Sequence, residues 1–533
     1  MFDFVYNTSP MRRTQLLADP AGRFVHDIVL DSCRRNGGKT ALADSSCGRR
    51  VSYAEYGDLV ETLARGLVSA GLRPGEVVAI FLPNSWEFAI TYHAATLAGG
   101  IPTLLNPAYR EREICYQLEN SEAVFLITDG PLIEGITLTG LPRLRRVFTT
   151  RQERAGCERF GDLLRAPVFA KLPATIDDSA RTIGALPYSS GTTGLPKGVM
   201  LSHYNLVANV FQLLGPGAAM LTESDVMLCF LPLYHIYGLT VGLTTSLALG
   251  ATLVLMPRFD VQRLGTLAVQ EGVTFVPMVP PAINVLCQAA AAGTFPTDHR
   301  IRWIKSGAAP LAPELARRLT ELTGIAVNQG YGMTEASPVT HVGYLDPPEM
   351  NRPASIGQAL AMTECRVLDL EDREVAAGEA GELVMRGPQF MLGYWKEPRA
   401  TAAVLRNGWY YSGDIVRTDA DGFFYVLDRR KEMIKYKGFP VAPAEVEAVL
   451  LEHPAVRDCG VVAKPDVEAG EIPCAFVVVR ESITASTALG AELRAFVADR
   501  LAHHKQPREV HFVDAVPRTP SGKVLRRELR KRF

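Results

Sequence analysis

The sequence has almost no excess of charge of either sign. Its 533 residues include 56 lysines and arginines against 57 aspartates and glutamates, which gives a formal net charge of −1. This balance gives no electrostatic basis for binding nucleic acid or an anionic membrane surface, so we expect neither as a partner. A small charged substrate remains compatible with the composition.

Cysteine pairs, targeting segments and membrane spans are also missing. The nine cysteines are scattered without a C-x-x-C pair, which is typical of reduced thiols in a cytoplasmic protein rather than of disulfides or zinc. An acid appears early in the chain, and no targeting signal is evident. The uncharged stretch Leu231 to Pro257 has the length of a membrane span, but Gly238, Gly242 and Gly250 divide it into a helix and a buried strand. We therefore expect no span.

Length and periodicity predict a fold of more than one domain. At 533 residues the chain exceeds one ordinary hydrophobic core. Ser52 with Glu55 predicts the start of a helix, followed by an apolar strand at 77–82 and a helix at 86–97. This alternation, which recurs through 124–128, 251–256, 273–276 and 301–305, is typical of doubly wound βαβ units around a parallel sheet.

The second half of the chain has a different texture. Short strands separated by Gly and Asp turns between 364 and 427 predict a small β-barrel-like module that completes the large domain. After Asp428 we expect a small mobile α+β domain, with helices near 443–452 and 491–501, strands near 456–463 and 474–479, and a basic tail. The predicted fold is therefore α/β, with an N-terminal domain at 1–428 and a C-terminal domain at 429–533.

One loop carries the strongest chemical signal, because it combines hydroxyl groups, glycines and a lysine that can all bind an anionic oxygen array. It is not a Walker A loop, since the spacing G-x-x-x-x-G-K-[ST] is absent. The plainer alternative is a mobile surface turn with a solvated lysine. The candidate phosphate-binding residues are Ser189, Ser190, Gly191, Thr192, Thr193, Gly194 and Lys197.

This loop resembles the signature of the adenylate-forming superfamily of acyl-CoA synthetases, adenylation domains and luciferases. Further motifs that resemble those of the superfamily follow in order at 231–238, 305–310, 331–335, 411–414, 428–439 and 520–523. The resemblance spans nearly the whole chain. It is nearest to the coumarate:CoA ligase group and to aryl or medium-chain acyl-CoA synthetases.

The resemblance implies an enzyme that uses ATP, Mg²⁺ and coenzyme A to convert a carboxylate into an acyl adenylate and then into a thioester. Lys523 matches the catalytic lysine, Glu335 the magnesium ligand and Thr334 a contact to the α-phosphate. Asp414 and Arg429 match ribose-binding residues. The remaining residues that match the nucleotide site are Gly307, Ala308, Ala309, Gln329, Gly330, Tyr331, Gly332 and Met333. Taken without the motifs, these residues have plainer interpretations. Glu335 could be a surface glutamate, Tyr331 a core aromatic residue and Asp414 a turn aspartate. Lys523 could belong to a solvated basic tail.

For the second step, the resemblance implies rotation of the small domain about a hinge at Lys431. Lys435, Gly438 and Phe439 would then face the site, with Lys435 assisting thioester formation. Pro440 departs from the family pattern, which usually has Gln or Arg there. This departure puts the geometry of the second step in doubt.

The acyl pocket is implied to contain His235, Tyr237, Gly238, Lys305, Gly330, Pro338 and Val339. His235 would adjoin the substrate carboxylate or gate the pocket, with a satisfied core histidine as the alternative. No aspartate near Tyr234 could pair with an ammonium group, so an amino-acid substrate is disfavoured. Glycines at 238 and 330 leave space for an aryl, alicyclic or medium-chain acid.

Two other functions stay open at this point. The thiol acceptor could be the phosphopantetheine of a carrier protein instead of coenzyme A. A non-catalytic relative could bind nucleotide or acyl-CoA as a scaffold or sensor, although such a protein need not keep Lys197, Glu335, Asp414 and Lys523. The sequence is compatible with a monomer or a homodimer.

Overall fold

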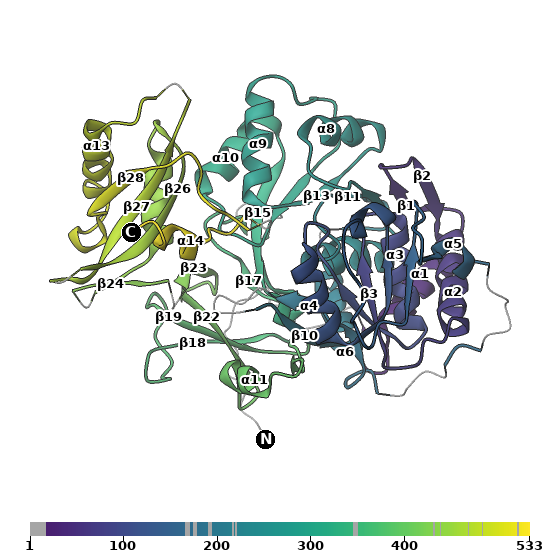
Figure 1. Cartoon of the computed structure of the whole chain (residues 1–533). Coiled ribbons are helices and arrows are strands. Elements are labelled where there is room, and N and C mark those ends of the chain that lie inside the picture. Colours follow the sequence, from purple (N-terminus) through teal and green to yellow (C-terminus); the bar gives the residue numbers. More distant parts are fainter. Residues whose placement is uncertain are drawn as a thin grey trace.

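The computed structural model describes residues 18–533 apart from 166–170, 174–177, 190–194, 216–217, 219–220, 345–349, 430–431, 438, 467, 482 and 520–521. The side chains of Phe439 and Pro440 are also outside the description. Figure 1 shows a large body that contains α1 to α11 and a smaller C-terminal body that contains β24 to α14. Among the described helices, none combines the length and apolar composition that crossing a membrane would need.

The larger of two mainly parallel sheets has nine strands in the order β17-β16-β15-β14-β13-β11-β12-β1-β2. The strands from β15 to β1 along this order are parallel, whereas β2, β16 and β17 pair in the antiparallel sense. Its strands are β1 (Thr40–Asp44), β2 (Arg49–Ser52), β11 (Val226–Cys229), β12 (Thr252–Leu255), β13 (Phe275–Met278), β14 (Trp303–Ser306), β15 (Ala326–Gly332), β16 (Val339–Val342) and β17 (Gln358–Ala359).

The second sheet is wholly parallel, in the order β4-β3-β5-β6-β7. Every residue of β3 and β5 is buried, as expected of parallel strands covered on both faces. The strands are β3 (Val77–Phe81), β4 (Ile101–Leu104), β5 (Ala123–Thr128), β6 (Arg146–Thr149) and β7 (Glu158–Arg159). The predicted doubly wound α/β architecture is therefore confirmed.

The helices of the large body follow the strands in sequence, and two begin where the sequence predicts. Ser52 caps α2 by accepting a hydrogen bond from the Glu55 N–H, and α3 has the predicted bounds. The helices are α1 (Val25–Asn36), α2 (Tyr53–Ser69), α3 (Trp86–Leu97), α4 (Glu111–Ser121), α5 (Phe160–Leu163), α6 (His203–Leu214), α7 (Thr245–Leu249), α8 (Val261–Gln270), α9 (Pro280–Ala291), α10 (Pro313–Thr323) and α11 (Pro398–Val404). The large body also contains a four-residue 3₁₀ turn, η1 (Gly130–Ile133), and a three-residue 3₁₀ turn, η3 (Thr334–Ala336).

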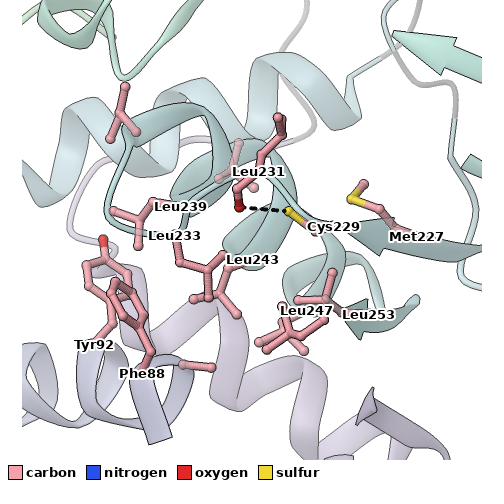
Figure 2. Packing of buried hydrophobic residues seen from close by; sticks show 14 of the residues in the cluster. Phe88, Tyr92, Met227, Cys229, Leu231, Leu233, Leu239, Leu243, Leu247 and Leu253 are labelled. Atoms are coloured by element: carbon pink, nitrogen blue, oxygen red, sulfur yellow. Dashed lines mark hydrogen bonds between the residues drawn. The ribbon is translucent and has the colours of Figure 1, made fainter. Parts of the chain in front are cut away.

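The uncharged stretch after Leu231 forms a helix and then strand β12, as predicted, but the helix begins as a π-helix, η2 (Tyr237–Thr244), before α7. Figure 2 shows leucines of this segment packed with those of the preceding loop. The Sγ of Cys229 donates a hydrogen bond to the Leu231 carbonyl, and a Cβ on Gly242 would lie 2.6 Å from that sulfur. The glycine therefore permits close packing.

Two smaller sheets contain the remaining described strands of the large body. One contains β8 (Ile183–Ala185), β9 (Tyr188–Ser189), β10 (Lys197–Ser202) and β20 (Gly393–Tyr394). The other is the predicted antiparallel module, with the strands β18 (Glu364–Leu368), β19 (Gly381–Arg386), β21 (Leu405–Arg406), β22 (Trp409–Thr418) and β23 (Phe424–Arg429). These sheets bring residues from distant parts of the chain to one site.

The C-terminal body is α+β and has its own hydrophobic core. One face of its sheet packs under α12 and α13 around Val446 and Leu493, and the other packs around Phe476 and Leu529. Helix α13 begins earlier than predicted because Ser486 caps it. The elements are β24 (Ile434–Tyr436), β25 (Phe439–Val441), α12 (Pro443–Glu452), β26 (Val456–Asp466), β27 (Gly470–Val479), α13 (Thr487–Ala498), the 3₁₀ turn η5 (His503–Lys505), β28 (Glu509–Phe512) and α14 (Arg526–Arg530).

Candidate active site

Lys197 begins β10, where it pairs with Ser189 of β9. The lysine is half-buried, and its Nζ lies 5.4 Å from the ring centroid of Tyr394. The other predicted phosphate-loop residues, Ser190, Gly191, Thr192, Thr193 and Gly194, lie outside the described residues. The structure thus fixes where the loop's lysine stands.

Glu335 lies in η3, next to Thr334, and is buried. The Tyr394 hydroxyl donates a hydrogen bond of 2.8 Å to Oε1 of this carboxylate. Among the described residues, Oε2 accepts no hydrogen bond. Tyr394 is a site residue that the sequence reasoning missed, because a single tyrosine after a glycine carries no motif of its own.

Asp414 and Arg429 lie on neighbouring strands, in register across β22 and β23. The Arg429 Nε is 3.2 Å from Asp414 Oδ1, and the Tyr331 hydroxyl donates a hydrogen bond to Oδ2. Asp414 is buried, and its own N–H is held by Ser412 Oγ at 3.0 Å. The structure therefore assembles three of the predicted nucleotide residues into one hydrogen-bonded group.

Lys523 of the C-terminal body reaches the same site. Desolvation and the charge of Arg429 lower the pKa of Lys523 to about 8, against the opposing effects of Asp414 and Glu335. Part of the side chain remains exposed. The tail ammonium thus lies within electrostatic range of the Asp414 and Glu335 carboxylates of the large body.

The hairpin that carries Lys523 is braced within its own body and rests on the other. Arg518 forms an ion pair of 2.6 Å with Asp458 and donates a hydrogen bond of 2.8 Å to the Gly522 carbonyl. A Cβ on Gly522 would lie 2.9 Å from Cγ of Pro281, at the start of α9. The basic tail is therefore not simply solvated.

The pKa of His235 is also affected by the charge of Lys523. Burial and, second, the positive charge of Lys523 lower the pKa of His235 to about 4. Its Nδ1 accepts a hydrogen bond of 3.2 Å from the Tyr237 N–H. The imidazole is therefore neutral near pH 7, with Nδ1 as its acceptor nitrogen.

The residues implied in the second step are not at this site. Lys435 is exposed on β24, where its N–H donates to Glu471 Oε2 at 2.8 Å. Within the described part of the chain, no hydrogen bond or ion pair joins Lys435 to the large body. The predicted hinge Lys431 and Gly438 lie outside the described residues, as does the side chain of Phe439.

Three of the predicted acyl-pocket residues, His235, Lys305 and Val339, contact Tyr237. Its hydroxyl donates to the Lys305 carbonyl at 3.0 Å, and a Cβ on Gly307 would lie 2.8 Å from its ring. The Lys305 ammonium donates to the Gly343 carbonyl at 2.7 Å, and burial lowers the pKa of this lysine to about 7. Val339 packs with Tyr237 in a small apolar cluster.

The structure corrects one reason given for a glycine. A Cβ on Gly238 would lie 2.3 Å from the Pro232 carbonyl oxygen, so glycine is required by the backbone and does not leave space for a substrate. A Cβ on Gly330 would lie 3.1 Å from the His341 carbonyl oxygen, a tight contact but a less severe one than at Gly238. A Cβ on Gly332 would meet the carbonyl of Pro338, which accepts from the Met333 N–H at 2.9 Å.

Among the remaining predicted nucleotide-site residues, Gln329 makes hydrogen bonds within the protein. The Gln329 amide donates to the Pro353 carbonyl and accepts from the Leu311 N–H, so both of its ends are engaged within the protein. Ala308 has a φ of 69° and, with Ala309, is half-buried after β14. Small side chains at this turn leave the backbone open to a planar group.

Comparison with known proteins identifies the family. The model of the AMP-binding enzyme family matches residues 29–395, and that of the AMP-binding enzyme C-terminal domain matches residues 445–523. The chain is 37% identical to 4-coumarate–CoA ligase 5 of Oryza sativa subsp. japonica over 517 residues, which cover 96% of this chain and 94% of that protein.

Two solved structures share the whole architecture. The anthranilate CoA ligase AuaEII in complex with anthranoyl-AMP has a TM-score of 0.86 and 28% identity, over 96% of this chain and 98% of that one. ATP-bound MatB from Rhodopseudomonas palustris has a TM-score of 0.86 and 29% identity, over 96% and 99%. The chain therefore belongs to the AMP-binding enzyme family, and it is an acid–thiol ligase of the adenylate-forming superfamily.

Proposed function

We propose that this ligase joins an aryl carboxylic acid to coenzyme A in two steps at the site described above. In the first step a carboxylate oxygen of the acid bonds to the α-phosphorus of ATP, the bond between the α- and β-phosphates breaks, and pyrophosphate leaves. In the second step the thiolate of coenzyme A bonds to the acyl carbon, and AMP leaves. The aryl class is supported by relatives whose names give coumarate and anthranilate as their acids.

One arrangement supports the first step: Lys523 lies across the boundary between the two bodies, within electrostatic range of Asp414, Glu335 and His235, and the preceding Gly522 lies against Pro281 of the large body. Both reactants are anions, so the step needs positive charge at the reacting oxygens. An ammonium on a separate body can supply that charge and then withdraw. Asp414 accepts hydrogen bonds from hydroxyl groups, which suits it to the ribose of ATP.

Glu335 is the residue that fits a magnesium ion. Magnesium prefers hard oxygen ligands and is usually bound by one or two carboxylates together with substrate phosphates and water. The buried Glu335 has one carboxylate oxygen held by Tyr394 and another without a hydrogen bond among the described residues. When bound, the ion would neutralise phosphate charge. Lys197 would stand at the pyrophosphate end.

The second step requires a different face of the C-terminal body, because the hairpin that carries Lys523 is the part that lies against the large body at Pro281 in the structure. We propose that this body turns as a unit at the boundary between residues 428 and 429, with the hinge at Lys431. The turn would bring Lys435 to the reacting thiol. The separate cores of the two bodies support such a motion.

An exchange assay with labelled pyrophosphate tests the first step. We expect exchange into ATP with magnesium and 4-coumarate, benzoate or anthranilate, and much less with a medium-chain fatty acid. Supplying coenzyme A or a phosphopantetheinyl carrier protein to the same mixture then identifies the acceptor. Absence of exchange with every acid of a broad panel would remove the proposed reaction.

A further inference from the structure

Tyr394 stands between two groups of the predicted pyrophosphate end of the site. It lies on β20, which pairs with β10 so that Tyr394 is opposite Val199. Its hydroxyl donates to Glu335 Oε1 at 2.8 Å, and its ring centroid lies 5.4 Å from Lys197 Nζ. One side chain therefore contacts both the candidate magnesium ligand and the phosphate-loop lysine.

The direction of the hydrogen bond follows from chemistry. An ionised carboxylate can only accept, so the phenol must donate. The distance of 2.8 Å between the phenol oxygen and Oε1 is that of a hydrogen bond from a hydroxyl donor to a carboxylate. Glu335 Oε1 is therefore committed to Tyr394, and a cation would meet Oε2.

The contact with Lys197 has a different effect. An aromatic face attracts an ammonium group without neutralising it, whereas a carboxylate at the same place would neutralise its charge. Among the described residues, no ion pair joins Lys197 to Glu335, although both contact Tyr394. With respect to the described residues, the lysine thus keeps its charge available for a phosphate, and the glutamate keeps one oxygen available for a cation.

We propose that Tyr394 is a positioning residue for the magnesium and pyrophosphate end of the site. It orients Glu335 so that one oxygen is presented to the ion, and it keeps Lys197 apart from that carboxylate. This inference rests on the proposed function. Residues that orient metal ligands by hydrogen bonds commonly contribute to metal affinity, and their loss typically weakens it about 10-fold to 100-fold.

The first test is the magnesium dependence of nucleotide binding. Calorimetry would measure binding of an ATP analogue with a methylene between the α- and β-phosphates, so that no turnover occurs. For Tyr394→Phe, which keeps the ring, we expect the magnesium concentration at half-saturation to rise about 10-fold. Tyr394→Leu, which also removes the ring, should in addition weaken analogue binding at saturating magnesium.

Tyr425→Phe is the matched control. The Tyr425 hydroxyl also donates to a carboxylate, Asp419 Oδ2 at 2.9 Å, but outside the site. This variant should bind magnesium and analogue as the parent protein does. An equal shift in Tyr394→Phe and Tyr425→Phe would contradict a specific role for Tyr394, and so would an unchanged magnesium dependence in Tyr394→Phe.

A double-mutant cycle separates positioning from general structural support. If Tyr394 acts through the carboxylate, Tyr394→Phe should add no further shift in magnesium dependence to a Glu335→Gln protein. Full additivity of the two shifts would overturn the inference. Failure of the parent protein to bind the analogue at all would instead overturn the proposed function, and this inference with it.

Discussion

Gly522 of the C-terminal hairpin packs against Pro281 at the start of α9, and a Cβ at position 522 would lie 2.9 Å from Pro281 Cγ. Gly522 also has a φ of 86°, in the left-handed region that favours glycine. The residue that delivers Lys523 is thus constrained both by its own backbone and by the opposite body.

Gly522→Ala should therefore impair the first step selectively. The added methyl group would strain the turn and push the hairpin away from Pro281, moving Lys523 from the reacting oxygens. We expect pyrophosphate exchange to fall about 10²-fold, as for a catalytic group displaced by about 1 Å. Thioester formation from a synthetic acyl adenylate should change little. Comparable loss of both reactions would argue against this docking contact.

Lys523→Ala should slow the first step more strongly than Gly522→Ala does. Removing a donor that stabilises developing charge typically costs on the order of 10²-fold to 10³-fold in rate. Conversion of a presynthesised adenylate and coenzyme A should persist, because the second step needs Lys523 withdrawn. Equal loss of adenylation and thioester formation would contradict this division of labour.

The first step should slow as pH rises through about 8. The lowered pKa of Lys523, about 8, means that its ammonium loses its proton above that pH and with it the charge that the reaction needs. His235, with a pKa of about 4, stays neutral throughout this range and adds no change. The measurement is kcat/KM for pyrophosphate exchange between pH 6 and 9.5.

Lys523→Arg provides the control for this pH profile. Arginine stays protonated throughout the range, so the decline near pH 8 should disappear even if the overall rate is lower. A decline that persists unchanged in the arginine variant would assign the titration to another group.

Gly238→Ala should destabilise the large body, because the new Cβ would lie 2.3 Å from the Pro232 carbonyl oxygen. Overpacking of this kind costs about 1–3 kcal/mol of the free energy of unfolding. Urea denaturation measures the loss. Gly161→Ala is the control, since a Cβ there meets nothing within 4 Å. Similar stability of the two variants would return Gly238 to the role of leaving space for a substrate.

Local sequence signals predicted much of the architecture. Helix α3 has the predicted bounds because its cap, apolar strand and alternation are all short-range features, and α12 (Pro443–Glu452) agrees for the same reason. The π-helix η2 could not be predicted, since a short apolar run has no period that separates it from an α-helix. The motifs indicated the site because they occur in the order that the superfamily has. Each also contributes a residue, such as Lys197 or Glu335, that can bind a phosphate or its metal ion.

Sequence reasoning failed where a role depends on distant neighbours. In the sequence, a glycine at position 238 is the same letter whether it makes room for a ligand or for a backbone carbonyl group. Only the packing around Gly238 shows that the neighbour is a carbonyl group. Tyr394 and Glu335 are 59 residues apart, and nothing local to either predicts their hydrogen bond. The two segments are held together by tertiary contacts such as the hydrogen bond of 2.8 Å from the Met391 N–H to the Glu335 carbonyl.

The C-terminal body contains both its own core and the Arg518 to Asp458 brace that shapes the Lys523 hairpin. If this body were fused to the large body of a related ligase, the hairpin that positions Lys523 would keep its conformation. The recipient would need only a surface that accepts Gly522 where Pro281 lies here. Acid preference and lysine delivery could thus diversify in evolution as exchangeable parts.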